Sequence, residues 1–262
     1  MKQTALCAVG VLPVRKQPAS SSEQTTQLLF GDIVYITDEY TGKNNLSDAW
    51  FQIQNTYDNY CGWVDKRNVI SISEKHIKDE KYIVRSPVTY VYFDNQPILI
   101  PAASRLIDTK FNTDCHEIRI ANQEDITPFL PYTTQSLNRI IQIYRNAPYQ
   151  WGGKSILGLD CSGFVQNVFS FFNIRLPRDA SVQAGCGSEI AFEDIQTGDL
   201  CFFSDKKHSV NHVAIYIGDN RAVHCSAKVH TDCIDAEGIY IYDGNSCKQY
   251  SHRLTSVRRI LQ

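Results

Sequence analysis

The spacing of apolar residues divides the chain into a strand-rich first part and a second part in which helices precede strands. In the first part, short runs alternate every two residues, the period of a half-buried strand, between turns rich in Gly, Ser and Asn. In the second part, the period is first three to four residues and then becomes two. Helices followed by an antiparallel sheet indicate an α+β fold. We expect three domains, spanning residues 1–73, 74–128 and 129–262.

The first two of these domains are expected to be small β-barrels. Closely spaced short strands predict a barrel over the first domain. The second domain is less regular, so a second, divergent barrel is expected there on weaker grounds. Its strand candidates are 88–93, 98–100 and 117–120, with a turn at Asp94–Asn95 between the first two.

Two helices with one apolar face are predicted early in the third domain. The first runs from about Thr134 to Asn146 and is stopped by Pro148. The second follows a turn that holds Gly152 and Gly153, and begins at or next to Cys161. A third, short helix is expected near Ser181. The stripes that define the first two helices are Leu137, Ile140, Ile141 and Tyr144, and Phe164, Val165, Val168, Phe169 and Phe172.

The composition limits which binding partners and which cellular compartment are expected. The chain has 262 residues, is 43% hydrophobic and carries a formal charge of −2, so neither nucleic acid nor a membrane is expected as partner. Its nine cysteines contain no CxxC pair and indicate reduced thiols. The run from Thr4 to Val14 only weakly resembles a signal segment. We expect a cytoplasmic protein, with export to the periplasm or cell surface as the alternative.

Cys161 is the candidate nucleophile. Unpaired N–H groups and the positive end of the helix dipole lie at a helix start, and both favour a thiolate. A cysteine nucleophile also needs a base and a group that orients the base. His212 is expected to be the base and His224 the orienting residue, because both lie on predicted strands that flank a turn at Gly218–Asn220.

The register of this hairpin decides whether the two histidines face each other. If the loop is the three residues 218–220, Ile217 pairs with Arg221 and Ala214 pairs with His224. His212 then lies diagonally across from His224 on the same face. A loop of only Asp219 and Asn220 would turn His224 to the opposite face.

Metal binding is the rival chemistry. Zinc prefers tetrahedral sites of nitrogen and sulfur ligands. The candidate ligands show no recognised spacing, so no metal and no cofactor are expected. They are His208, His212, His224, Cys225, His230 and Cys233.

Five motifs in order resemble the NlpC-type family of bacterial cell-wall cysteine peptidases. They are Tyr149-x-Trp151-Gly152-Gly153, Leu159-Asp160-Cys161-Ser162-Gly163-Phe164-Val165, Leu176-Pro177-Arg178-Asp179-x-Ser181-x-Gln183, Gly198-Asp199-Leu200, and His212 to Gly218 followed by His224. The resemblance implies a papain-like core, helices packed on an antiparallel sheet, that cleaves the bond between γ-D-glutamate and a diamino acid in murein peptides. It implies Cys161, His212 and His224 as the catalytic residues and Tyr149 at the oxyanion.

One or two SH3-like domains ahead of such a core resemble the dipeptidyl-peptidase VI subgroup, whose murein tripeptide or related cell-wall peptide carries a free N-terminal L-Ala. The resemblance implies a closed pocket in which carboxylates bind the ammonium group. Asp160 and Asp179 are the candidate carboxylates. Asp160 is equally expected to cap the helix, which does not exclude binding. The chain departs from the subgroup at Ala180, where Ser is frequent. The residues implied in binding are Asp160, Ser162, Trp151, Arg178, Asp179, Ser181, Tyr60 and Glu23.

Two other functions compete with a peptidase that recycles murein peptides. One is a secreted endopeptidase that acts on intact cell wall and is tethered by its SH3-like domains. The other is a binding module that keeps the fold without catalysis. The complete set of Cys161, His212 and His224 argues against the second of these.

Overall fold

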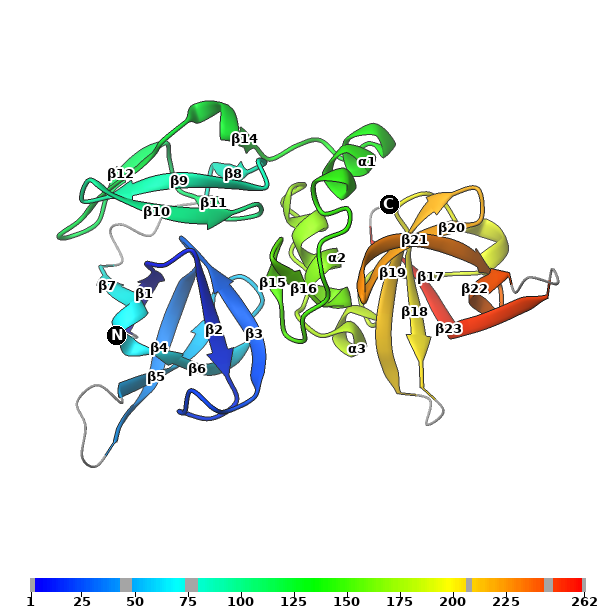
Figure 1. Ribbon diagram of the computed structural model, residues 1–262, viewed down its shortest axis with the longest axis horizontal. Coiled ribbons are helices and arrows are strands. Elements are labelled where there is room, and N and C mark those ends of the chain that lie inside the picture. The colour runs from blue at the N-terminus through cyan, green and yellow to red at the C-terminus, as the bar shows by residue number, and fades with distance from the viewer. Residues whose placement is uncertain (1–2, 43–48, 74–79, 206–208, 243–246, 261–262) are drawn as a thin grey trace.

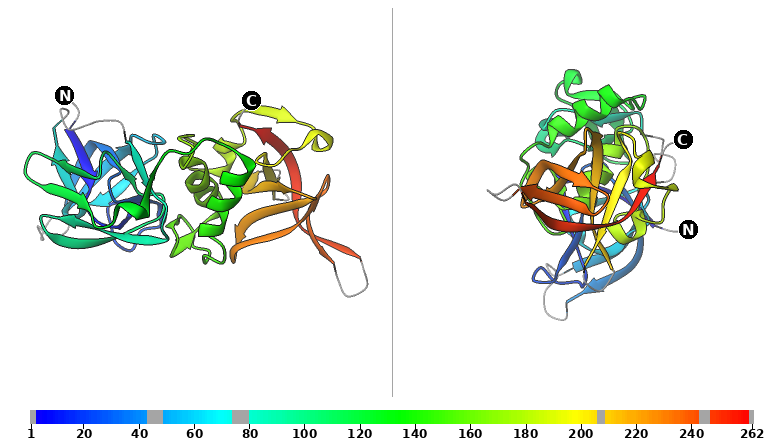
Figure 2. Two further views of the ribbon diagram at one scale, coloured as in Figure 1. Left: turned by 90° about the horizontal axis from the view of Figure 1, so that it is seen from above. Right: turned by 90° about the vertical axis from the view of Figure 1, so that its right-hand side faces the viewer.

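A computed structural model describes residues 3–42, 49–73, 80–205, 209–242 and 247–260. Two β-rich units formed by the N-terminal half lie on one side of a group of helices, and a C-terminal sheet lies on the other (Figures 1 and 2). The α+β fold class with SH3-like strands ahead of it is therefore confirmed. The expected start of the second domain, residue 74, lies outside the described residues.

The first unit is a seven-stranded antiparallel sheet with strand order β3-β2-β6-β5-β4-β1-β7. Alternate residues of its strands enclose a core that includes Leu12, Val14, Phe51 and Ile53. A Cβ on Gly62 would approach Val14 to 2.4 Å, which explains the glycine beside Trp63. The strands are β1 (Gln3–Cys7), β2 (Val11–Arg15), β3 (Gln24–Leu29), β4 (Ile33–Thr41), β5 (Ala49–Asn55), β6 (Cys61–Asp65) and β7 (Val69–Ile72).

The second unit packs two small antiparallel sheets, β10-β9-β13-β12 and β11-β8-β14, around one core. Phe30 of the first unit inserts into that core. The predicted turn is present, because Asp94 and Asn95 have positive φ and join two paired strands. A second SH3-like barrel stays a prediction. The strands are β8 (Tyr82–Val84), β9 (Val88–Phe93), β10 (Gln96–Pro101), β11 (Arg105–Leu106), β12 (Lys110–Asn112), β13 (Glu117–Ile120) and β14 (Ile126–Pro128).

The third unit packs helices against a seven-stranded antiparallel sheet of order β17-β23-β18-β19-β20-β21-β22, which β22 and β23 close by pairing. The helices are α1 (Thr134–Ile143), α2 (Cys161–Ser170) and α3 (Ala180–Gln183). The strands are β15 (Lys154–Ser155), β16 (Gly158–Leu159), β17 (Ser188–Ile190), β18 (Leu200–Ser204), β19 (Val210–Gly218), β20 (Arg221–Ser226), β21 (Lys228–Asp235), β22 (Gly238–Tyr242) and β23 (Lys248–Arg259).

Helix α1 ends earlier than the apolar spacing predicted. Its last helical residue is Ile143, and Asn146 adopts a left-handed conformation with φ of 64°. Asn tolerates this region better than most residues, so the chain turns before Pro148 is reached. The predicted apolar stripe is otherwise present, since Leu137, Ile140 and Ile141 are buried.

Helix α2 is buried on all sides, although its sequence predicted only one apolar face. Its polar residues face partners from the turn before it and from the first domain. Gln166 donates to the Asp58 carboxylate at 2.8 Å, and Asn167 donates to the Lys154 carbonyl at 2.7 Å. Buried polar groups need such partners. The contact with Asp58 therefore fixes the first domain against the helix that carries Cys161.

Candidate active site

The start of α2 is fixed by a cap and by a close backbone approach. Asp160 accepts a hydrogen bond from the Gly163 N–H at 2.7 Å and from the Gly152 N–H at 2.9 Å, so it is the N-cap of the helix. A Cβ on Gly163 would lie 2.2 Å from the carbonyl oxygen of Gly153. The first turn of the helix thus needs glycine, and Cys161 is held in its first helical position.

The sulfur of Cys161 lies against the backbone that flanks His212. Its Sγ is 3.9 Å from the Asn211 carbonyl, and the Val213 N–H hydrogen-bonds to it. Asn211 is an extra residue in β19, because Phe203 pairs with His212 and Ser204 with Val210. Such bulges redirect side chains next to active sites. Cys161 and His212 therefore lie beside each other.

Burial raises the pKa of the Cys161 thiol to about 11. Asp160 adds to this rise, whereas the backbone N–H groups of Val213 and Ser162 and the charge of Arg178 lower the pKa. The helix start thus acts in the direction expected from the sequence, but the loss of water around the sulfur outweighs it. Attack by Cys161 consequently requires a base that removes its proton.

The predicted pairing of Ala214 with His224 is confirmed, but the loop that produces it was predicted wrongly. Only Asp219 and Asn220 form the turn, both with positive φ, and Gly218 pairs with Arg221. A bulge between Tyr216 and Gly218 adds the residue that restores the register. A two-residue turn favours positive φ at both positions, which Asp and Asn tolerate.

The two histidines meet as this register requires. Nε2 of His212 lies 2.8 Å from Nδ1 of His224, and both side chains are buried. The His212 ring stacks on His252, with centroids 4.3 Å apart. Burial, followed by the neighbouring histidines, holds the pKa of His212 well below its usual value. His212 is therefore a neutral imidazole near neutral pH and can accept a proton.

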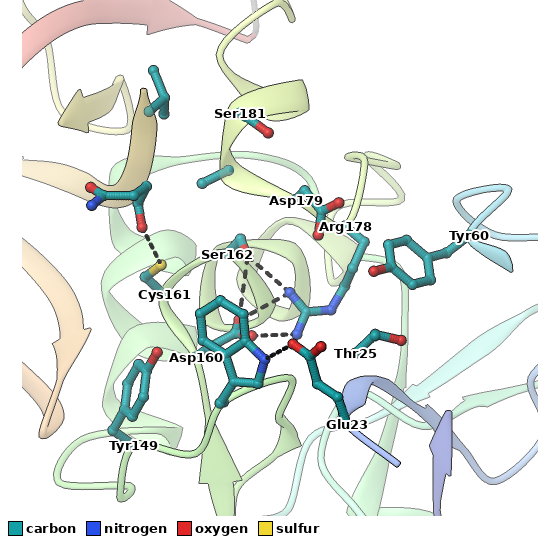
Figure 3. A pocket seen from close by; sticks show the side chains of 14 residues that line it. Glu23, Thr25, Tyr60, Tyr149, Asp160, Cys161, Ser162, Arg178, Asp179 and Ser181 are labelled. Carbon is teal, nitrogen blue, oxygen red and sulfur yellow. Dashed lines mark hydrogen bonds and ion pairs between the residues drawn. The ribbon is translucent and has the colours of Figure 1, made fainter. Parts of the chain in front are cut away.

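A cavity of about 360 Å³ opens in front of Cys161. Figure 3 shows Cys161 and Tyr149 on one side of it, Tyr60 and Glu23 on the other, and Arg178 between them. The lining includes every residue that the resemblance implied in substrate binding, together with Tyr149. The lining residues that sequence reasoning missed are Thr25, Val210 and Asn211, and Ala180, where the chain departs from the subgroup, also lines the cavity.

The floor of the cavity is a buried ion pair. Arg178 binds Asp160 through two parallel hydrogen bonds of 3.0 and 2.5 Å, and also donates to Ser162 at 2.8 Å. Its Nε donates to the hydroxyl of Thr26 in β3 at 2.7 Å. Asp160 thus caps α2 and pairs with Arg178, and it also lines the cavity, so its predicted part in substrate binding stays a prediction. Arg178 links this cap to the first domain.

The end of the cavity away from Cys161 is acidic. Asp179 is exposed there. Glu23 of the first domain also lines this end, and its Oε1 accepts a hydrogen bond from the indole N–H of Trp151 at 3.0 Å. Burial and the nearby Asp179 raise the pKa of Tyr60, whose hydroxyl also contacts Thr25. Glu23 also pairs with Lys16 at the surface, at 3.5 Å, and burial raises the pKa of Asp179 while Arg178 lowers it. The carboxylates of Glu23, Asp160 and Asp179 together outnumber the Arg178 guanidinium in the cavity lining. This end suits a cation.

Tyr149 borders the reacting sulfur. Burial and the proximity of Cys161 raise the pKa of its phenol to about 12. The group thus keeps its proton near neutral pH and can donate a hydrogen bond to a developing oxyanion.

The residues considered for zinc separate into two groups. Cys225 turns away from the histidines and contacts the Leu159 carbonyl at 3.2 Å. His208 lies outside the described residues. Among those described, ligand atoms of His224, His230 and Asp232 lie within 4.8 Å of one another. Both imidazoles contact the same Asp232 oxygen, at 3.2 and 3.1 Å, so hydrogen bonds account for this grouping.

Comparisons with known proteins agree with this geometry. Residues 146–252 match the NlpC/P60 family and residues 10–70 match the bacterial SH3 domain. A probable endopeptidase of Haemophilus influenzae is 39% identical over 119 residues, which cover 45% of this chain and 68% of the relative. The chain belongs to the NlpC/P60 family, and it is a cysteine peptidase with a papain-like core.

Two further relatives resemble the chain over most of its length. The γ-D-glutamyl-L-lysine dipeptidyl-peptidase of Bacillus subtilis is 27% identical over 212 residues, covering 76% of this chain and 71% of the relative. An NlpC/P60 family protein from Bacillus cereus of known structure is 21% identical, with a TM-score of 0.81 over 99% of this chain and 100% of that chain. The second likeness extends the shared fold to the N-terminal units.

No helix in the described part of the chain is both long and apolar enough to cross a membrane.

Proposed function

We propose that the protein hydrolyses the γ-D-glutamyl–diamino acid bond of murein peptides that carry a free N-terminal L-Ala, and releases L-Ala-γ-D-Glu. The observation that supports this most is the acidic end of the cavity, built by Glu23 and Tyr60 of the first domain and by Asp179. A buried ammonium group needs such carboxylates. The name of the Bacillus subtilis relative, a dipeptidyl-peptidase, agrees with this specificity.

Acyl transfer would proceed in two steps. His212 takes the proton of Cys161 as the sulfur attacks the γ-carbonyl carbon, and Tyr149 donates to the oxygen that becomes negative. His212 then gives its proton to the leaving amine, which departs as the diamino acid. Water attacks the resulting thioester with His212 again as base, and this releases the dipeptide and restores the thiol.

Closure of the cavity by the first domain supports the choice of a short peptide over intact cell wall. Trp151 and Glu23 meet across the domain boundary, and a cavity of about 360 Å³ suits the end of a small peptide. We further propose a cytoplasmic role in the recycling of such peptides. In the alternative, the protein is exported and cleaves intact peptidoglycan.

Mass spectrometry of three digests tests the proposal. The substrates are the free tripeptide, the same peptide acetylated at its N-terminus, and insoluble sacculi, with a Cys161→Ala variant as control. We expect diamino acid release from the free tripeptide only, and none from the variant. Equal release from the acetylated peptide, or soluble fragments from sacculi, would instead favour the exported endopeptidase.

A further inference from the structure

A hydrogen-bond chain continues beyond the two histidines of the active site. Nε2 of His224 lies 3.2 Å from Oδ2 of Asp232, on the side of the ring away from His212. Asp232 and His230 lie two residues apart on β21 and share a face, and His230 pairs directly with His224 of β20. The carboxylate is thus presented to the far nitrogen of His224 by the sheet itself.

The bond between His212 and His224 does not by itself fix where the protons lie. Each neutral imidazole has one N–H and one acceptor nitrogen, so the proton in the bond between His212 Nε2 and His224 Nδ1 can belong to either ring. Nδ1 of His212 is the ring nitrogen not engaged with His224, and only one arrangement leaves it able to accept a proton. A group at the other end of the chain must select it.

Asp232 is such a group because an ionised carboxylate accepts hydrogen bonds and donates none. The hydrogen bond with His224 lowers the pKa of Asp232, so the carboxylate stays ionised near neutral pH. It therefore requires the proton of His224 on Nε2. Nδ1 of His224 then accepts from Nε2–H of His212, and Nδ1 of His212 is left without a proton.

We infer that Asp232 is a positioning residue that sets the direction of the proton relay from Cys161 through His212. The inference rests on the proposed function only in that Cys161 is the nucleophile, and it does not depend on which peptide is cleaved. When His212 takes the proton of Cys161, the positive charge that forms is separated from Asp232 only by the His224 ring. The carboxylate thus also favours the protonated state of His212.

Other titratable groups around the relay do not provide the same selection. His252 of β23 stacks on the face of His212 and lies edge-on to His224, with centroids 4.3 and 5.6 Å apart. His230 binds Asp232 at 3.1 Å and directs its other nitrogen to the Lys228 carbonyl at 2.7 Å. In the described structure, Asp232 is the carboxylate in contact with the far nitrogen of His224.

Nitrogen-15 NMR of the histidine rings in the intact protein tests the inference without any variant. We expect the proton of His224 on Nε2 and that of His212 on Nε2. A proton on Nδ1 of either ring in the neutral state would overturn the inference, whatever the substrate is.

The rate of Cys161 alkylation by iodoacetamide across pH 6–9, followed by peptide mass spectrometry, gives a second test. In Asp232→Asn, the amide can either donate to or accept from His224, so both proton arrangements become available and alkylation should slow between about tenfold and 100-fold, less than the 10²–10⁴ of a complete general base. The control is Asp235→Asn, which removes another carboxylate of β21, one that binds Lys248 and Tyr250. It should alkylate at the wild-type rate.

Turnover separates the inference from the proposed function. For any murein peptide that is cleaved, Asp232→Asn should lower kcat with little change in KM, since Asp232 does not line the cavity. Wild-type alkylation rates and an unchanged ring protonation pattern in a folded Asp232→Asn protein would overturn the inference. If alkylation is slowed in Asp232→Asn and the wild-type protein does not cleave the tripeptide, the inference stands and the proposed substrate is rejected.

Discussion

The indole N–H of Trp151 donates to the carboxylate of Glu23 at 3.0 Å, across the boundary between the peptidase domain and the first domain. The Trp151 carbonyl also accepts from the side chain of Gln24 at 3.0 Å. A Cβ on Gly152, the residue after Trp151, would lie 2.7 Å from the Gln24 carbonyl oxygen, so the two backbones are in contact there. The acidic end of the cavity therefore exists only when the two domains are docked.

Removing the charge of Glu23 should weaken binding of a free N-terminus. For Glu23→Gln, we expect KM for the free tripeptide to rise about tenfold or more, because a hydrogen bond to a charged group contributes about 1.5–3 kcal/mol. The change in kcat should be small. Steady-state kinetics of Glu39→Gln, a surface carboxylate of the same domain paired with Lys66, provides the control. An equal effect in both variants would reject the assigned role of Glu23.

Arg178 should be among the residues most important for stability. In Arg178→Met, the buried Asp160 carboxylate loses its partner, and breaking a buried pair costs about 3–5 kcal/mol. Urea unfolding measures this loss. Arg67→Met, which breaks an exposed pair with Asp65, should leave the free energy of unfolding nearly unchanged. Similar midpoints for the two variants would show that the link through Thr26 and Asp160 does little.

The first turn of α2 should not tolerate a side chain at Gly163. An added methyl group would meet the Gly153 carbonyl oxygen at 2.2 Å, and overpacking of this kind costs about 1–3 kcal/mol. Gly163→Ala should therefore lower both the unfolding midpoint and the alkylation rate of Cys161. Gly185→Ala, whose Cβ would lie 3.4 Å from the Val182 carbonyl, should behave like wild type. A fully active Gly163→Ala protein would contradict the close approach.

Stability should fall as the pH is lowered below about 6.5, the usual pKa of histidine. Burial and the neighbouring histidines lower the pKa of His212 in the folded state. Between that lowered pKa and 6.5, the unfolded chain binds the proton and the folded protein does not. Stability thus rises with pH in this window, by up to about 1.4 kcal/mol per pH unit for this one group.

Urea unfolding at several pH values between 5 and 8 measures this slope. Comparison with His212→Asn isolates the contribution of His212, because the variant cannot bind the proton in either state. The slope should be smaller in the variant. Equal slopes would mean that His212 is protonated alike in the folded and unfolded chains.

The sequence predicted the fold class and the family because its motifs and periodicities are local. Tyr149, Trp151 and Cys161 lie in short stretches whose order alone carries the resemblance. The pairing of Ala214 with His224 was also predicted, although through a three-residue loop. A bulge at Ile217 produces the same register from a two-residue turn. The pattern of apolar residues does not distinguish a three-residue loop from a two-residue turn followed by a bulge.

The remaining features depend on contacts that a sequence pattern does not contain. Gln166 and Asn167 look like the exposed side of α2, but Asp58 of the first domain accepts from Gln166 and the Lys154 carbonyl accepts from Asn167. Asp232 reaches His224 only through the pairing of β20 with β21, for which the sequence offered the alternation of His230 and Asp232 as a signal. The expected preference for a thiolate was outweighed by burial, which depends on how closely β19 covers Cys161.

Trapping of the covalent intermediate tests the central claim most directly. Wild-type protein mixed with L-Ala-γ-D-Glu-diamino acid, quenched in acid within milliseconds and digested, should show the L-Ala-γ-D-Glu acyl group on the peptide that carries Cys161. The adduct should be absent from Cys161→Ala and from protein mixed with the N-acetylated peptide. An acyl group on another residue, or continued release of diamino acid by Cys161→Ala, would contradict the account.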